Sequence, residues 1–197
     1  HLADIHIRNI KRHTEYSLVF ENFYEQVKKD NLDNALIFIG GDIAHAKTEM
    51  SPELIKQISS FLRRCSNLHP TLVIAGNHDC NLNNPDRLDV LSPIMDMMDD
   101  DNLFYLKNSG VYKIGDVAVG VFSILDDPED YVSGLDITDS DIKTKIGVYH
   151  GAVKRSMTDI GYVVMGGDIE LPMFNGYDIV MLGDIHKYQV LQEYQSE

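Results

Sequence analysis

The sequence predicts a layered α/β fold in which two β-sheets lie between helices. In the first half of the chain, segments with apolar residues at helical spacing alternate with short apolar runs that are typical of buried strands. The second half consists mostly of strand-like runs. The chain has 197 residues, enough for one domain with a substantial core. We therefore expect a single domain over residues 1–197.

Three helices are expected in the first half. The first spans Thr14–Lys29, and its first residue is a suitable N-cap. The second has Ser51 as its N-cap and Pro52 at the first helical position, and its apolar face continues to Cys65. The third is expected over Asp86–Met98.

Strands are expected wherever a short apolar run ends in glycine or polar residues. In chain order they are Leu2–Ile5, Ala35–Ile39, Thr71–Ala75, Leu103–Leu106, Val111–Ile114, Val117–Phe122, Lys145–Tyr149, Ile179–Leu182 and an edge strand at Val190–Tyr194. Gly115 and Asp116 are expected to form a hairpin turn. The acidic segment Leu125–Thr144 has few apolar residues and is expected to be a loop.

The amino-acid composition is that of a globular protein without a membrane-spanning segment. Apolar residues make up 44% and charged residues 24%, which is a globular balance, and no apolar run approaches the roughly 18 residues of a membrane span. The net charge of −14 argues against a broad nucleic-acid-binding face. Bound divalent cations would nevertheless concentrate positive charge in one cleft. Because the chain begins at His1 without an initiator Met or a signal-like segment, we expect it to be an excised domain.

Polar residues of metal-binding type follow five of the apolar runs at their carboxyl ends, where open α/β sheets place their sites. They are Asp4 and His6, Asp42, Asn77, His150, and Asp184 with His186. Singly, such an aspartate could cap a turn and such a histidine could belong to the core. Their coincidence at five strand ends instead predicts a metal centre. Carboxylates and imidazoles without thiolates suit Mn, Fe, Zn or Co, and Asp42 could bridge two ions.

These residues resemble the signatures of the calcineurin-like metallophosphoesterases. The matching segments are Asp4-Ile5-His6, Gly41-Asp42, Gly76-Asn77-His78-Asp79, His150 and Gly183-Asp184-Ile185-His186. The resemblance implies a four-layer metallophosphoesterase sandwich, with two mixed β-sheets flanked by helices. Asp79 is typical of the phosphodiesterase and nuclease branches of the superfamily. Within those branches the chain most resembles SbcD-type DNA double-strand-break-repair nucleases and phage recombination endonuclease subunits, through the segments His1-Leu2-Ala3-Asp4-Ile5-His6, Gly41-Asp42-Ile43-Ala44-His45 and Tyr149-His150-Gly151-Ala152.

The resemblance also implies a role for each residue. The first metal would be held by Asp4, His6, Asp42 and His186, and the second by Asp42, Asn77, His150 and Asp184. His78 would face the scissile phosphate, and Asp79 would orient the His78 side chain. His45 would assist nuclease action. The two divalent ions are expected to be Mn, with Mg, Fe or Zn as alternatives.

Two positions depart from the family pattern. Asp184 stands where the family usually has histidine, and Arg8 stands where it often has glycine. A carboxylate at position 184 can still bind the second ion and favours a harder metal such as Mn or Mg. The DNA-binding cap and the segment that binds an SbcC-type ATPase partner are expected to be missing from this chain.

The predicted reaction is hydrolysis of a phosphodiester by a metal-bridging hydroxide, in DNA during repair or recombination, as an exonuclease or endonuclease. Alternatives are a phosphodiesterase or phosphatase acting on a small molecule or phosphoprotein, and a metal-free scaffold that binds a partner. Two cysteines without CxxC spacing, Cys65 and Cys80, indicate reduced thiols and an intracellular protein, cytoplasmic or nucleoid-associated. A viral or phage origin and a homodimer are left open.

Overall fold

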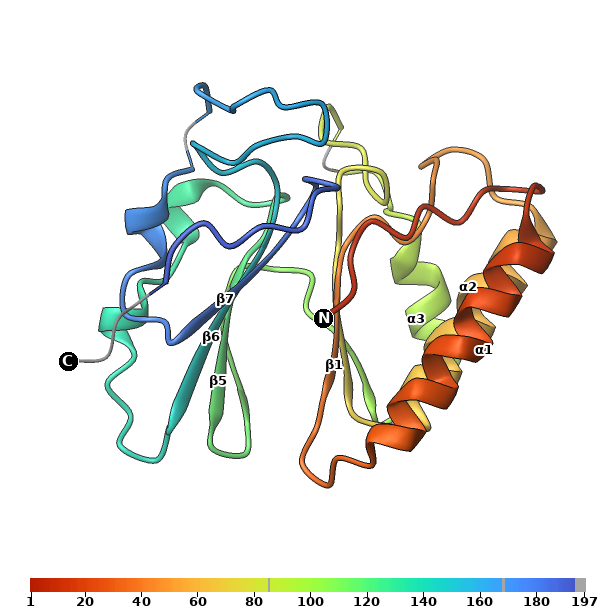
Figure 1. Ribbon diagram of the computed structural model, residues 1–197, viewed down its shortest axis with the longest axis horizontal. Coiled ribbons are helices and arrows are strands. Elements are labelled where there is room, and N and C mark those ends of the chain that lie inside the picture. The colour runs from red at the N-terminus through yellow and green to blue at the C-terminus, as the bar shows by residue number, and fades with distance from the viewer. Residues whose placement is uncertain (85, 168, 194–197) are drawn as a thin grey trace.

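A computed structural model describes residues 1–84, 86–167 and 169–193 (Figure 1). Its α-helices are α1 (His13–Asp30), α2 (Pro52–Ser66) and α3 (Leu91–Met98). Its strands are β1 (Ile37–Gly40), β2 (Thr71–Ile74), β3 (Leu103–Tyr105), β4 (Gly110–Ile114), β5 (Val117–Phe122), β6 (Thr144–His150) and β7 (Ile179–Gly183). Single 3-10 turns lie at Pro128–Asp130, Gly134–Asp136 and Leu171–Phe174. None of the helices in the described part of the chain is long and apolar enough to cross a membrane.

The strands form two sheets. The first has the order β1-β2-β3 and is parallel throughout. The second has the order β4-β5-β6-β7 and is mixed, because β4 and β5 form a hairpin while β5, β6 and β7 run parallel. The hairpin turns at Gly115, whose φ of 61° suits a glycine, so that Ile114 pairs with Val117 as predicted.

Three hydrophobic cores separate four layers, which confirms the predicted sandwich. The first sheet is parallel where a mixed sheet was expected, because α2 and α3 connect its strands. The first core lies between the β1-β2-β3 sheet and the three α-helices, with Phe61 and Leu62 of α2 fully buried. The second lies between the two sheets and includes Phe38 and Val148. The third lies under the 3-10 turns on the outer face of the second sheet. Figure 1 shows the α-helices on one side of the sheets and the 3-10 turns on the other.

Two helix starts differ from the prediction. The first helix begins at His13 without a side-chain cap, because Arg12 takes the left-handed conformation just before it. The third begins at Leu91 rather than at residue 86. Asp89 accepts hydrogen bonds from the backbone N–H groups of Leu91 and Ser92, at 2.9 and 2.6 Å, and so fixes the start.

Both ends of the chain are less regular than predicted. Residues 2–5 do not form a continuous strand. They run beside β1 in isolated contacts, in which the Leu2 N–H donates to the Phe38 carbonyl at 2.8 Å and the Gly40 N–H donates to the Leu2 carbonyl at 2.7 Å. At the other end, residues 190–193 are irregular where an edge strand was expected, and Tyr194 lies outside the described residues.

Candidate metal centre

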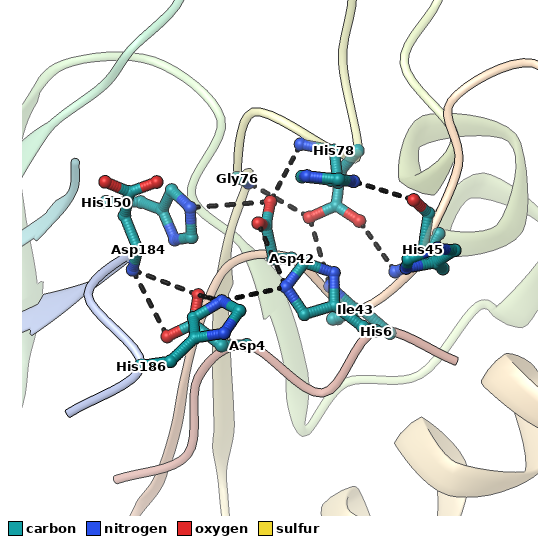
Figure 2. Close-up of polar contacts among 12 residues, drawn as sticks. Asp4, His6, Asp42, Ile43, His45, Gly76, His78, His150, Asp184 and His186 are labelled. Atoms are coloured by element: carbon teal, nitrogen blue, oxygen red, sulfur yellow. Dashed lines mark hydrogen bonds and ion pairs between the residues drawn. The ribbon is translucent and has the colours of Figure 1, made fainter. Parts of the chain in front are cut away.

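The predicted site residues come together at the carboxyl ends of β1, β2, β6 and β7, where the two sheets meet (Figure 2). Residues 4–6 run alongside the turn after β1, since the N–H groups of Asp4 and His6 donate to the Gly41 and Asp42 carbonyls at 3.1 and 2.9 Å. The pairing brings the beginning of the chain to the ends of the strands. Four strand ends and one N-terminal segment therefore supply a single cluster.

The backbone at this cluster is strained. Asp4, His6, Asp42 and Asp184 all have positive φ values, of 56°, 50°, 54° and 83°. Non-glycine residues rarely adopt this conformation, and it tends to persist where a functional site requires it. Four of the seven predicted metal ligands share it, which indicates that the fold positions them for a purpose other than stability.

Two glycines make the close approach of the strands feasible. Gly41 has a φ of 88°, and a Cβ there would lie 2.5 Å from Nδ1 of His150 and 2.8 Å from the Gly76 backbone. A Cβ on Gly76 would collide with the carboxylate of Asp42. Any side chain at either position would therefore push apart residues that the cluster needs together.

Three of the four residues predicted for the first metal share one group. The ligand atoms of Asp4, His6 and His186 all lie within 4.8 Å of one another. The Nε2 atoms of His6 and His186 are 3.1 Å apart, and Nε2 of His186 is 3.7 Å from the Asp4 carboxylate. Asp42, the fourth, has its Oδ2 atom 3.6 Å from Nε2 of His6. Burial lowers the pKa of His6, which favours the neutral ring that a metal ion requires.

A second group contains Asp4, Asp42 and the buried His150. Nε2 of His150 lies 3.4 Å from Oδ1 of Asp42, and its Nδ1 pairs with the Gly40 carbonyl oxygen at 2.6 Å. A hydrogen bond at Nδ1 fixes the ring and leaves Nε2 as the metal-binding atom. Burial alone would lower the pKa of His150, but the Asp42 carboxylate outweighs it and raises the pKa to about 9.

Asp184 makes a backbone contact within the site in addition to its predicted side-chain role. Its backbone N–H donates to both carboxylate oxygens of Asp4, at 3.0 and 3.2 Å, so this segment orients a predicted ligand of the first metal (Figure 2). Among the described residues its carboxylate does not join the His/Asp groups that are close enough to share an ion. Burial raises its pKa, and the charge of His150 partly offsets this. Coordination of the second ion by Asp184 therefore remains a prediction.

Unsatisfied polar atoms gather at the same place. In the described part of the chain, five buried side-chain nitrogen or oxygen atoms lack a hydrogen-bond partner. Four of them belong to this cluster: Nδ1 of His6, Nδ1 of His45, Oδ1 of Asn77 and Nε2 of His150. Buried polar atoms are almost always paired, so their concentration here indicates that the cluster accommodates a ligand. The atoms on Asn77 and His150 are those predicted to hold the second metal, and the donor set fits divalent ions.

The residues predicted to act on substrate lie beside this group. The His78 backbone N–H donates to Asp42 Oδ1 at 2.8 Å, and the His78 ring pairs through Nδ1 with the His45 carbonyl oxygen at 2.7 Å. The rings of His6 and His78 are 4.7 Å apart between centroids. His78 is thus held next to the metal ligands, with its Nε2 left for other partners.

Asp79 does not orient its neighbour through a side-chain contact. Its carboxylate is fully buried and accepts hydrogen bonds from three backbone N–H groups, those of Ile43, Ala44 and Gly76, at 3.3, 2.9 and 3.0 Å. Burial raises its pKa to about 6, which these hydrogen bonds partly offset. Asp79 therefore joins the loop after β1 to the loop after β2, and any effect on His78 passes through the backbone.

Two contributors to the site were not anticipated. The Gly40 carbonyl orients His150, and the Tyr16 hydroxyl donates to the His6 carbonyl at 2.6 Å. Tyr16 lies within the helix predicted over Thr14–Lys29, where an aromatic residue at helical spacing gives no sign of a polar role. Backbone carbonyls leave no trace in side-chain patterns, so the contact to His150 had no sequence signal.

A family model for the calcineurin-like phosphoesterases matches residues 1–188. The chain belongs to this family. Membership assigns it to a group of metal-dependent phosphoester hydrolases and confirms the resemblance carried by the sequence motifs.

A relative of similar sequence is the uncharacterized protein R555 of Acanthamoeba polyphaga mimivirus, which is 43% identical over 202 residues. That alignment covers 98% of this chain but 15% of the viral protein, so the chain spans a small part of its relative's length. A nuclease of Pseudomonas putida, named MPE, is a structural neighbour with a TM-score of 0.36 and 18% identity, over 74% of this chain and 57% of that one.

Proposed function

We propose that this phosphoesterase domain hydrolyses phosphodiester bonds in DNA with two divalent ions, of which Mn²⁺ fits best. The observation that supports it most is the convergence of unpaired buried ligand atoms from Asn77 and His150 with the Asp4–His6–His186 group. The two sets share Asp42, whose two oxygens face His6 and His150 respectively. One carboxylate between two groups of ligands is the arrangement that a pair of adjacent ions requires.

Bound ions would supply charge neutralisation on the phosphate and activation of the nucleophile. The chain's own residues would do the rest. His78, held by its backbone to Asp42 and by its ring to the His45 carbonyl, is positioned to stabilise or protonate the leaving oxygen. His6 and His150 would bind the ions as neutral rings, and because the pKa of His150 is raised to about 9, that ring would release a proton on binding. The buried Asp79 would hold the loops after β1 and β2 together.

Preference for a phosphodiester over a phosphomonoester rests on the sequence. The Asn77-His78-Asp79 segment and His45 resemble the nuclease and phosphodiesterase branches of the family rather than its protein phosphatases. The structure places the rings of His45 and His78 in a stacked arrangement, with centroids 5.8 Å apart. Both histidines can therefore reach one substrate.

The alternative is a phosphodiesterase or phosphatase that acts on a small molecule or a phosphoprotein. The net charge of −14 favours it, because long nucleic acids are repelled by an acidic surface. A role in DNA repair or recombination, and an ATPase partner, follow only if DNA proves to be the substrate.

One assay separates these possibilities. Labelled single-stranded DNA, labelled double-stranded DNA, bis-p-nitrophenyl phosphate and p-nitrophenyl phosphate are each incubated with Mn²⁺, Mg²⁺ or EDTA. We expect Mn²⁺-dependent cleavage of DNA and of the diester, with little turnover of the monoester. Rapid turnover of the monoester and intact DNA would refute the proposal in favour of a phosphatase.

A further inference from the structure

Beyond the two predicted metal positions, three imidazoles form a further group, which shares His6 with the first. The ligand atoms of His6, His45 and His78 all lie within 4.8 Å of one another. Their ring centroids are 4.7 Å apart for His6 and His78, 5.6 Å for His6 and His45, and 5.8 Å for His45 and His78. All three side chains are partly buried. Figure 2 shows them on the side of Asp42 away from His150.

His6 has a ring nitrogen to spare for this group. Its Nε2 atom faces the first-metal residues, since it is 3.1 Å from His186 and 3.6 Å from Asp42. Its Nδ1 atom, on the other side of the ring, is buried and has no hydrogen-bond partner among the described residues. A metal-binding histidine normally donates from its second nitrogen to a carbonyl or carboxylate, as His150 can to Gly40. His6 lacks that partner.

His45 also has a buried ring nitrogen for which the described ranges of the chain offer no hydrogen-bond partner. Its Nδ1 atom is buried and is without a partner in the described part of the chain, although its backbone carbonyl pairs with the His78 ring. Because that contact occupies Nδ1 of His78, the remaining nitrogen of His78 is Nε2. Each of the three rings therefore offers one nitrogen that no protein group occupies. A buried nitrogen without a partner is costly, and two in adjacent rings point to a missing ligand.

We propose that His6, His45 and His78 form a third cation site, selective for a borderline-soft divalent ion such as Zn²⁺, and that occupancy of this site inhibits the enzyme. This inference rests on the proposed function, because it assumes the two other ions and a role for His78 on the phosphate. Three imidazole-ring nitrogens with a fourth position open are a donor set that suits Zn²⁺ in tetrahedral geometry. Mn²⁺ and Mg²⁺ prefer oxygen ligands and would not fill an all-nitrogen site.

Inhibition follows from the identity of the ligands. An ion on Nε2 of His78 takes the atom that would otherwise reach the leaving oxygen. An ion on Nδ1 of His6 would share that ring with the first metal, which requires loss of the ring proton and lowers the ring's freedom to adjust. The same chain would then work with Mn²⁺ alone and lose activity when Zn²⁺ is in excess.

The decisive measurement is the number of ions bound per chain, by equilibrium dialysis and elemental analysis, with Mn²⁺ alone and with Zn²⁺ alone. We expect two Mn²⁺ and three Zn²⁺ for the unaltered protein. His45→Ala and His78→Ala should each reduce the Zn²⁺ count to two and leave the Mn²⁺ count at two. His69→Ala is the matched control, since His69 precedes β2 at the end of the sheet opposite the site, and it should still bind three Zn²⁺.

Equal counts of Zn²⁺ and Mn²⁺ in the unaltered protein would overturn the third site, as would three Zn²⁺ in both histidine variants. Circular dichroism establishes that each variant is folded. A Mn²⁺ count below two would contradict the proposed two-metal function instead, so the two failures are distinguishable. Anomalous diffraction at the zinc edge gives an independent test, with a third peak expected among His6, His45 and His78.

Discussion

Asp79 is a buried acid whose carboxylate joins two loops of the metal centre. It accepts hydrogen bonds from three backbone N–H groups, two in the loop after β1 and one in the loop after β2. The side chain is completely buried, so solvent does not reach the N–H groups that it accepts from. The residue is therefore expected to act on stability and on the geometry of the site together.

Asp79→Ala should lower the free energy of unfolding by about 3 kcal/mol or more, because each buried N–H left without a partner costs roughly 1–3 kcal/mol. Asp79→Asn keeps one acceptor oxygen and should lose less. Urea denaturation of the metal-free protein measures both. Asp116→Ala removes an exposed carboxylate that is paired with Lys143 and should change stability little. If Asp79→Ala is no less stable than that control, the carboxylate does not hold the loops.

His78→Ala should keep both Mn²⁺ ions and lose activity by about 10²–10⁴-fold, the usual contribution of a positioned acid. Its backbone N–H still donates to Asp42, so the bridging carboxylate stays in place. Elemental analysis and hydrolysis of bis-p-nitrophenyl phosphate are the two readouts. Normal turnover, or loss of a Mn²⁺ ion, would show that His78 has another role.

Asp184 has a backbone role and a predicted side-chain role that mutation can separate. Asp184→Ala retains the N–H that donates to Asp4, so the first ion should remain bound. The methyl group has no lone pair, so the second ion should bind more weakly. Asp184→His should keep two ions and shift preference toward softer metals, because nitrogen replaces oxygen. Two Mn²⁺ ions and normal hydrolysis in Asp184→Ala would mean that the carboxylate is not a ligand.

Strand β5 shows how an element of the second sheet accommodates the outer layer. Gly120 lies at its centre and pairs with Gly147 of β6. The ring of Tyr177 occupies the space over these glycines, and its hydroxyl donates to the Val132 carbonyl at 2.8 Å. A Cβ on Gly120 would overlap that ring.

Gly120→Ala should therefore destabilise the protein by about 1–3 kcal/mol, the usual cost of overpacking a core. Gly166→Ala is the matched control, because a Cβ there meets nothing within 4 Å. Thermal unfolding of the two variants is compared with that of the unaltered protein. Equal melting temperatures for the two variants would show that Tyr177 moves aside at no cost.

Elements with strong local signals could be predicted from the sequence. The start of α2 was correct because Ser51 caps it, accepting from the Leu54 N–H at 3.1 Å, and Pro52 follows. The start of α3 was placed too early, although Pro93 is tolerated only in a first turn and could have marked it. The strand expected at residues 2–5 depended on non-local contacts with β1, which the sequence does not record.

At the scale of the whole molecule, the site arises from the meeting of the two sheets. Residues 4–6 and β1 belong with the first sheet, while His150 ends β6 and Asp184 follows β7 in the second. The sequence predicted the convergence because every motif follows an apolar run. It could not predict which atoms pair, and so it missed the Gly40 carbonyl and the backbone N–H groups that donate to Asp79.

The predicted metal ligands include three carboxylates and three imidazoles that lie close together. They are Asp4, Asp42, Asp184, His6, His150 and His186. Burial raises the pKa of Asp184, and the negative charges of Asp4 and Asp42 raise it further. Cations bound between them would relieve this repulsion. The folded chain should therefore depend on its ions for stability as well as for catalysis.

Adding Mn²⁺ to the EDTA-treated protein should raise the melting temperature. At a concentration 100 times the Kd, each ion contributes about 2.7 kcal/mol, which for a domain of this size corresponds to roughly 5–10 °C. His150→Ala removes a ligand of the second ion only, so its shift should be about half that of the unaltered protein. His69→Ala lies outside the site and should show the full shift. Differential scanning calorimetry measures all three. A full shift in His150→Ala would place the second ion elsewhere, because an ion that loses a ligand cannot stabilise the folded state as strongly as before.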